Sequence, residues 1–175
     1  MTIKTIFLDR DGVINKETGY LHKIEDFKFI NGVFEACQHY EQLGYKIVIV
    51  TNQSGISRGY YSEDDFRNIT DWMITQFNKN NIQILDTFHC PHSPISKCDC
   101  RKPKPGMLLE AKKKYNINML ESWMIGDSER DIIAANLAGI KNTILVRSGH
   151  TINEVNSNAT FFLDSIIQTN QIILK

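Results

Sequence analysis

Short apolar runs alternate along the chain with longer stretches of helical period. The runs at 3–8, 46–50, 84–89, 122–125 and 142–146 predict buried strands, and a weaker sixth run lies at 160–163. Between them, amphipathic stretches at 32–43, 62–78, 106–115, 129–138 and 165–171 predict helices. Because strands and helices alternate, we predict an α/β fold, with a parallel sheet covered by helices on both faces.

Local signals refine this pattern at several element ends. Ser62, with Asp65 three residues on, is typical of a helix start, and Asp164 is a candidate cap for the last helix. Gly44 and Gly139 follow predicted helix ends, where a left-handed residue is favoured. Residues 13–29 fit neither period, and we interpret them as a small hairpin flap after the first strand.

Composition limits the class of protein. The 175 residues fit a single domain spanning 1–175, with 42% hydrophobic and 23% charged residues as in soluble globular proteins. The chain has 20 basic and 20 acidic residues and therefore zero formal net charge. This balance does not predict a positively charged surface for nucleic acid or an anionic membrane. The apolar runs are too short to span a bilayer, and the chain enters a strand without a signal peptide. We therefore expect a cytoplasmic protein with reduced thiols.

The end of the first strand carries two carboxylates, Asp9 and Asp11, followed by Gly12, which lets the chain turn away. In an open α/β sheet, ligands bind at the carboxyl ends of the strands. An aspartate there can attack phosphorus and form an aspartyl-phosphate, and a second carboxyl group can carry protons. The alternative is that these residues only start a turn.

Two further strands end in polar residues suited to phosphate chemistry. Residues 51–55 after the second strand offer hydroxyl and amide donors, although an Asn/Gly-rich turn has the same composition. Asp127 ends the fourth strand and Asp131 follows one helical turn later, although an aspartate also caps helices. If Asp9, Asp11 and Asp127 meet at one rim of the sheet, they repel one another. A Mg²⁺ ion with oxygen ligands resolves that repulsion, and Arg101 and Lys102 supply positive charge toward a substrate.

Three of the four cysteines crowd into one short loop together with a histidine. Cys90, His92, Cys98 and Cys100 offer three thiolates and one imidazole, the donor set of a closed tetrahedral Zn²⁺ site with a structural role. A disulfide would leave an odd thiol, and coincidental clustering is the other alternative. Such a zinc site would fix the loop that leads into Arg101 and Lys102.

The remaining cysteine and histidines have simpler interpretations. His89 would point to the other side of an extended chain and away from the cluster. Cys37 is expected as a small buried residue in a helix. His22, His39 and His150 show no partner pattern and are expected as surface or satisfied histidines.

The combined pattern resembles the haloacid dehalogenase superfamily of phosphatases. The matching pieces are residues 9–12, Thr51, Lys102 before Pro103, and Gly126 and Asp127 with Asp131. The resemblance implies a Rossmann-like fold, Mg²⁺ dependence and an aspartyl-phosphate intermediate. The segments 12–32 and 51–90 leave no room for a large cap domain, so a capless member with an open site is expected.

Within that superfamily, the sequence is similar to the D-glycero-D-manno-heptose 1,7-bisphosphate 7-phosphatases. Their close relatives are the histidinol-phosphate phosphatases, which share the same zinc loop. The matching strings are 7–12, 19–20, 50–56, 58–59, 90–92, 98–103, 105–108 and 126–127. Two features depart from the family pattern. The loop between His92 and Cys98 is shorter, and Val13 stands where threonine is common.

The resemblance implies a role for each matching residue. Asp9 would be the nucleophile and Asp11 the general acid and base. Mg²⁺ would bind Asp9, Asp127 and the backbone carbonyl of Asp11. Thr51 and Lys102 would hold the phosphoryl oxygens, with Lys104 as a rival for the lysine role. Lys102 is favoured because it lies two residues from a predicted zinc ligand.

The leading hypothesis is a monomeric phosphatase acting on a small phosphosugar, with neither nucleic acid nor membrane as a partner. Arg101 would bind the distal 1-phosphate, since a guanidinium matches phosphate geometry. Further substrate contacts are expected from Arg10, Glu17, Thr18, Gly19, Tyr20, Asn52, Gln53 and Ser54. Histidinol-phosphate phosphatase activity is the first rival, although Arg101 would repel the cationic end of that substrate. A non-catalytic zinc-containing module that binds phosphosugars is the second, and the complete set of carboxylates argues against it.

Overall fold

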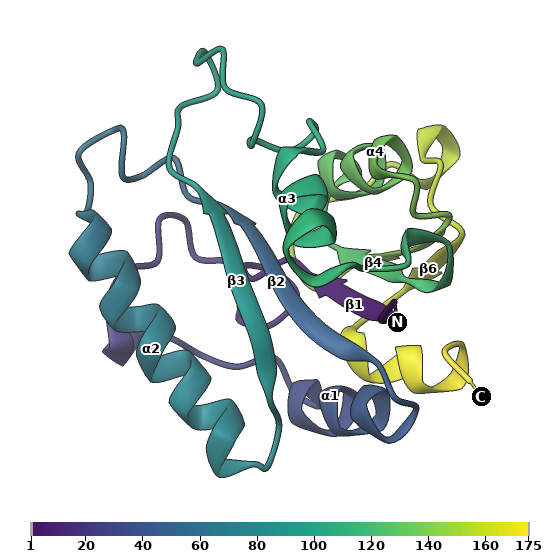
Figure 1. Ribbon diagram of the computed structural model, residues 1–175. Coiled ribbons are helices and arrows are strands. Elements are labelled where there is room, and N and C mark those ends of the chain that lie inside the picture. Colours follow the sequence, from purple (N-terminus) through teal and green to yellow (C-terminus); the bar gives the residue numbers. More distant parts are fainter. Residues whose placement is uncertain (1, 175) are drawn as a thin grey trace.

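The computed structural model describes residues 2–174 and contains one six-stranded parallel sheet (Figure 1). The strands are β1 (Thr5–Leu8), β2 (Lys46–Asn52), β3 (Ile84–Cys90), β4 (Trp123–Gly126), β5 (Asn142–Val146) and β6 (Phe161–Leu163). Their spatial order is β3-β2-β1-β4-β5-β6. The predicted α/β class is confirmed, including the weak sixth strand.

Within residues 2–174, four α-helices and four short 3₁₀ helices accompany the strands, and the last of them follows β6. The α-helices are α1 (Val33–Gln42), α2 (Glu63–Lys79), α3 (Gly106–Tyr115) and α4 (Glu129–Ala138). The 3₁₀ helices are η1 (Ile24–Asp26), η2 (Met119–Glu121), η3 (Glu154–Asn156) and η4 (Ile166–Gln171). Helices α1 and α2 cover one face of the sheet with η4, and α3 and α4 cover the other (Figure 1).

Side chains of the central strands pack into two separate hydrophobic cores, one on each face of the sheet. In β1, Ile6 and Leu8 pack with α1 and α2, whereas Phe7 between them packs with α3 and α4. In β2, Ile47 and Ile49 alternate in the same way with Val48 and Val50. Successive side chains of a strand point to opposite faces of the sheet, and helices cover both faces. The sequences of these strands are therefore continuous apolar runs.

Several predicted boundaries differ from the structure. Strand β2 continues to Asn52, so Thr51 and Asn52 are strand residues rather than a turn. The last predicted α-helix is the 3₁₀ helix η4. Asp164 does not cap it with its side chain, because that carboxylate pairs with Arg147 at 2.8 Å. The 13–29 segment contains isolated bridges and η1 but no paired strands, so it is an irregular flap rather than a hairpin.

Other local predictions are confirmed. Ser62 and Asp65 form both halves of a capping box at the start of α2. Gly44 and Gly139 have φ angles of +82° and +94° just after α1 and α4, as a left-handed helix end requires. Within residues 2–174, no helix is both long and apolar enough to cross a membrane.

The order of the strands creates the crevice that holds the site. From β1 the chain adds β2 and β3 on one side, and then β4, β5 and β6 on the other. Loops that leave β1 and β4 therefore separate in opposite directions, and a crevice opens at the carboxyl ends of these two neighbours. Asp9 follows β1 and Asp127 follows β4, so the topology brings them together.

Candidate active site

Asp9 lies at the mouth of the crevice, directly after β1. Its backbone N–H donates to the carbonyl of Ile125, which extends the pairing of β1 with β4 by one residue. Its carboxylate accepts the N–H of Arg10 at 2.7 Å and lies 3.1 Å from Lys102 Nζ. Burial raises the pKa of Asp9 to about 7, although the Lys102 ammonium opposes that rise. The site therefore needs positive charge to keep this carboxylate ionised and nucleophilic.

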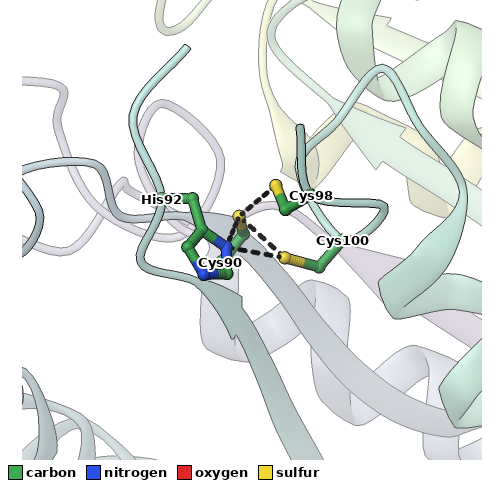
Figure 2. Close-up of side chains that lie close together, drawn as sticks. All are labelled: Cys90, His92, Cys98 and Cys100. Carbon is green, nitrogen blue, oxygen red and sulfur yellow. Dashed lines mark hydrogen bonds between the residues drawn. The ribbon is translucent and has the colours of Figure 1, made fainter. Parts of the chain in front are cut away.

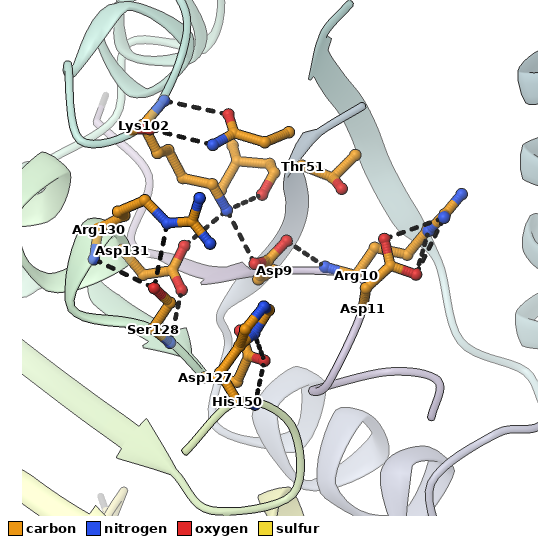
Figure 3. A network of polar contacts seen from close by, with 12 residues as sticks. Asp9, Arg10, Asp11, Thr51, Lys102, Asp127, Ser128, Arg130, Asp131 and His150 are labelled. Atoms are coloured by element: carbon orange, nitrogen blue, oxygen red, sulfur yellow. Dashed lines mark hydrogen bonds and ion pairs between the residues drawn. The ribbon is translucent and has the colours of Figure 1, made fainter. Parts of the chain in front are cut away.

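Lys102 is the central cation of the site (Figure 3). Its side chain is 2% exposed, and Nζ lies 2.6 Å from Asp131 Oδ1 and 3.1 Å from Asp9 Oδ2. Nζ also donates to the carbonyl of Val50 at 2.7 Å. Lys104, by contrast, is half exposed and pairs with Asp99. The structure thus places Lys102, and not Lys104, against the expected nucleophile.

Asn52 holds the backbone of Lys102 in place. Its side-chain Nδ2 donates to the Lys102 carbonyl, and its Oδ1 accepts the Lys102 N–H, both at 3.0 Å. Both ends of the amide are thereby occupied. Asn52 lines the cleft, as expected of a substrate contact. Its side-chain amide, however, already forms hydrogen bonds with the Lys102 backbone.

Asp127 is enclosed by two glycines and a histidine. Its Oδ2 accepts the backbone N–H of His150 at 2.9 Å and lies 2.6 Å from His150 Nδ1. A Cβ atom at Gly12 would lie 2.2 Å from this oxygen, and one at Gly149 would lie 1.9 Å from it. Only glycine fits at these two positions. His150 is therefore a site residue that the sequence analysis missed, since no motif or spacing connects it with Asp127.

Three carboxylates converge beside Lys102. Asp9, Asp127 and Asp131 each offer an oxygen, and these oxygens lie within 4.8 Å of one another. Burial raises the pKa of both Asp127 and Asp131. Asp127 Oδ1 is buried and has no hydrogen-bond partner among the described residues. An unpaired acceptor within a carboxylate cluster fits a hard cation such as Mg²⁺.

This carboxylate set differs in one member from the expected one. Asp131 was expected near the site but not as a ligand, and the structure adds it to Asp9 and Asp127. Its position follows from the start of α4, where its Oδ2 accepts the Ser128 N–H in a capping box. The side chain of Asp11 is outside the set, and a role for its backbone carbonyl stays a prediction.

The expected acid and base, Asp11, lies in the cleft wall with a buried arginine behind it. Arg10 is 1% exposed, and its guanidinium contacts the Asp11 carboxylate at 2.9 Å (Figure 3). This placement differs from the expected substrate contact of Arg10, because the side chain points below the cleft. Gln53 is likewise 2% exposed and donates to both Asp11 and Thr51. Arg10 thus reaches the site through Asp11, whereas Gln53 also lies in the wall of the cleft.

Two adjoining hollows form the cleft. The inner one, of about 60 Å³, is lined by Asp9, Asp11, Glu17, Thr51, Asn52, Lys102, Ser128, Arg130, Asp131 and His150. The outer one, of about 380 Å³, extends along Gly19, Tyr20, Gln53, Ser54, Tyr61 and Pro94. The two hollows share Asp11, Glu17, Asn52, Arg130 and His150. Thr18 lines neither hollow and faces a separate one on the other side of the flap.

Three guanidinium groups line the outer hollow, from Arg58, Arg101 and Arg130. Burial lowers the pKa of Arg101, and the like charges of Arg130 and Arg58 lower it further. Such a concentration of positive charge favours an anion in the outer hollow. Arg101 was expected here from the sequence. Arg130 was not, and its one signal is its place in the first turn of α4 after Asp127.

The Cys/His cluster forms as predicted (Figure 2). The ligand atoms of Cys90, His92, Cys98 and Cys100 lie within 4.8 Å of one another. Cys90 and Cys98 have their sulfur atoms 3.7 Å apart, and Zn–S bonds of about 2.3 Å place two thiolates of a tetrahedral site about 3.8 Å apart. All four cysteines of the chain are free thiols, so the disulfide alternative is not realised. The cluster is therefore able to hold a metal ion.

The other cysteine and histidines are also accounted for. Cys37 is fully buried in the core, as expected. His89 points away from the cluster and contacts Glu63 at 3.0 Å. His22 and His39 each donate one hydrogen bond to a backbone carbonyl, that of Tyr20 and that of Ile173.

Comparisons with known proteins point to one kind of enzyme. The HAD-hydrolase-like family model matches residues 99–169. A D-glycero-α-D-manno-heptose-1,7-bisphosphate 7-phosphatase from Photorhabdus laumondii is 49% identical over 90% of each chain. The β-named counterpart from Pasteurella multocida is 46% identical over 97% of this chain and 96% of its own. A D,D-heptose 1,7-bisphosphate phosphatase from B. bronchiseptica, solved with magnesium and phosphate, has a TM-score of 0.86 and 28% identity over 97% of each chain.

The two neighbouring lysines give a direct test of this geometry. Lys102→Met should lower the free energy of unfolding by about 3 kcal/mol or more in buffer without divalent cations, because it leaves buried carboxylates unpaired. Lys104→Met should cost no more than about 1 kcal/mol, because its ion pair is exposed. Urea denaturation of both variants measures the difference, and equal losses would contradict the central role of Lys102.

Proposed function

Because this chain belongs to the D-glycero-D-manno-heptose-1,7-bisphosphate 7-phosphatases, we propose that it removes the 7-phosphate of that heptose bisphosphate in the biosynthesis of nucleotide-activated heptose. One observation carries the proposal. The inner hollow offers Asp9 and Lys102 to one phosphate, and the adjoining outer hollow offers three arginines to a second. A substrate with two phosphates matches both.

We expect the enzyme to act as a monomer in the cytoplasm, where the thiols of the Cys/His cluster stay reduced.

The residues of the inner hollow divide the reaction into two displacements. The Asp9 carboxylate attacks phosphorus in line, the bond from phosphorus to the sugar oxygen breaks, and an aspartyl-phosphate forms. Asp11 protonates the departing alkoxide and then takes a proton from the water that attacks the aspartyl-phosphate. Phosphate leaves, and the Asp9 carboxylate is restored. The Thr51 hydroxyl and the Lys102 ammonium hold the phosphoryl oxygens through both steps.

The carboxylate cluster fits the Mg²⁺ ion that the sequence predicts. Asp9 and Asp127 would hold it with the carbonyl of Asp11, and the unpaired Oδ1 of Asp127 is an available ligand. When bound, Mg²⁺ offsets the charge of the carboxylates and of the phosphoryl group. The B. bronchiseptica relative, solved with magnesium and phosphate, supports this choice of cation.

The Cys/His cluster is proposed to bind a structural Zn²⁺ ion. Three thiolates and one imidazole fill a tetrahedral site and leave no position for substrate. The last ligand, Cys100, immediately precedes Arg101 and Lys102, and Arg101 Nη1 donates to the carbonyl of His92 at 3.2 Å. A metal ion here would therefore position the residues proposed to bind both phosphates.

The arginines also decide between substrates of the same reaction class. Histidinol phosphate carries a cation at the end remote from its phosphate. Three guanidinium groups in the outer hollow would repel that end, so we favour the heptose bisphosphate.

The relatives named for the α and β anomers are 49% and 46% identical, so sequence identity does not show which anomer this chain would hydrolyse. Kinetics on both anomers of the bisphosphate would show which is hydrolysed.

The nucleophile is tested by replacing Asp9. Asp9→Asn should abolish turnover of the heptose bisphosphate while leaving the melting temperature close to that of the unmodified protein, because amide and carboxyl have similar shapes. Asp11→Asn should also turn over very slowly, but it should still form phosphorylated protein with an aryl phosphate that has a good leaving group. Mass spectrometry of acid-quenched protein distinguishes the two, and a phosphorylated Asp9→Asn protein would refute the assignment.

The zinc site is tested by metal content. Elemental analysis should give about one zinc per chain after dialysis against metal-free buffer. Cys98→Ser should lose zinc, lower the melting temperature and reduce activity by releasing Arg101 and Lys102. Cys37→Ala is the control, because Cys37 is buried far along the chain from the cluster and its loss should leave the zinc content unchanged. Fully active protein without zinc would rule out the site.

The distal phosphate is tested through Arg101. A charge-assisted contact contributes about 1.5–3 kcal/mol, so Arg101→Ala should lower kcat/KM for the heptose bisphosphate by roughly ten- to a hundredfold. An aryl monophosphate should lose far less, because it has no second phosphate. Arg67→Ala, an exposed residue of α2 that pairs with Asp64, should change neither substrate. Equal losses for both substrates would mean that Arg101 serves the loop or the chemistry instead.

A further inference from the structure

A network of buried polar side chains surrounds Asp11, and two of its members, Gln53 and Tyr61, also line the outer hollow. Asp11 Oδ1 accepts hydrogen bonds from Arg10 Nε at 3.2 Å, Arg10 Nη2 at 2.9 Å and Asn15 Nδ2 at 2.9 Å. Oδ2 accepts from Arg10 Nη2 at 2.9 Å and Gln53 Nε2 at 3.0 Å. Arg10, Asn15 and Gln53 are all at most 2% exposed, whereas the Asp11 side chain is 18% exposed.

Tyr61 determines which end of the Gln53 amide faces Asp11. The Tyr61 hydroxyl donates to Gln53 Oε1 at 2.5 Å, and Arg10 Nη2 approaches the same oxygen at 3.5 Å. Burial raises the pKa of Tyr61 to about 12, so the hydroxyl remains a donor at neutral pH. With two donors at Oε1, the NH₂ group must face the acceptors Asp11 and Thr51. The reverse orientation would place Oε1 against a carboxylate.

Gln53 therefore connects the two groups that handle the phosphoryl reaction. Its Nε2 donates to Asp11 Oδ2 and, at 2.8 Å, to Thr51 Oγ1. Because the Thr51 oxygen already accepts this bond, its hydroxyl hydrogen is directed elsewhere, and Thr51 lines the inner hollow. One amide thus aligns a carboxylate from the loop after β1 and a hydroxyl from β2.

Arg10 prevents the carboxylate from rotating away. Among the described residues, Asp11 is the one anion with which Arg10 forms an ion pair. The remaining Arg10 nitrogen, Nη1, is buried and has no hydrogen-bond partner in the same set. Movement of Asp11 would leave a fully buried guanidinium without a counter-ion, which is strongly unfavourable. Arg10 Nη2 also donates to the carbonyl of Leu21, which joins the network to the flap.

We propose that Arg10, Gln53 and Tyr61 are positioning residues of the phosphatase reaction, which hold the Asp11 carboxylate and the Thr51 hydroxyl in fixed directions relative to Asp9. The inference rests on the proposed function, in which Asp11 must serve first the leaving oxygen and then water. Tyr61 acts at the greatest distance, because its hydroxyl reaches Asp11 only through Gln53. Its loss should therefore slow catalysis without removing a group that reacts.

The test compares two tyrosines that lose equivalent hydrogen bonds. Tyr61→Phe should lower kcat by about three- to tenfold, with KM nearly unchanged, since one buried hydrogen bond no longer fixes the Gln53 amide. Tyr40→Phe is the matched control. Its hydroxyl is also buried and lies 2.5 Å from Thr169, far from the cleft, so its loss should lower the melting temperature and leave kcat within about twofold. A raised KM with unchanged kcat in Tyr61→Phe would mean that Tyr61 contacts the substrate directly and would overturn the proposal.

A double-mutant cycle tests whether Tyr61 acts through Gln53. In a Gln53→Ala background, Tyr61→Phe should have almost no further effect on kcat, because the amide that it orients is gone. An unchanged loss in that background would overturn the proposal. Each measurement is made with the heptose bisphosphate and with p-nitrophenyl phosphate. If the unmodified protein hydrolyses only the aryl phosphate, the proposed substrate is wrong, and the cycle on p-nitrophenyl phosphate still decides the role of Tyr61.

Discussion

The pairing of Lys102 with buried carboxylates is the constraint around which the site is built. An ammonium group that is 2% exposed has lost its hydration, and the carboxylates of Asp9 and Asp131 replace that water. These carboxylates keep the pKa of Lys102 above its usual value despite its burial. Much of the surrounding structure serves this contact. The Asn52 amide fixes the Lys102 backbone, the capping box of α4 aims Asp131, and the end of β1 presents Asp9.

The glycines of the site follow from the same crowding. Gly12 and Gly149 leave just enough space for Asp127, and a Cβ atom at Gly126 would lie 2.4 Å from the Asp131 carboxylate. The carboxylates can approach one another and a cation only because no side chain stands between them. The glycines therefore contribute to the electrostatics of the site through the groups that they allow to come close.

Most of the fold was predictable from the sequence, because buried parallel strands form continuous apolar runs and the helices between them are amphipathic. The residues that follow β1, β2 and β4 were likewise predictable, since topology brings strand ends together. The directions in which individual side chains point could not be predicted from the sequence. Arg10 and Gln53 were expected in contact with substrate, but the side chains of both are buried and contact Asp11, and of the two only Gln53 lines the cleft among the described residues. His150 was missed because it lies in a loop whose path no local pattern specifies. Arg130 was missed because its position in the first turn of α4 does not reveal that it lines the cleft.

Arg101 and Lys102 are neighbours in sequence, yet they are anchored to different parts of the protein. Lys102 forms hydrogen bonds with two residues of β2, the Asn52 side chain and the Val50 carbonyl. Arg101 instead donates to the carbonyl of His92 in the Cys/His loop. The proposed roles, phosphoryl binding by Lys102 and substrate choice by Arg101, thus depend on different contacts, although both residues follow the same Cys/His loop. Changes between His92 and Cys98 would alter the rim of the cleft, where Pro94 lies, while the contacts with β2 would still hold the lysine. A fold of this kind can acquire new substrates by changes in one loop while the reaction itself stays the same.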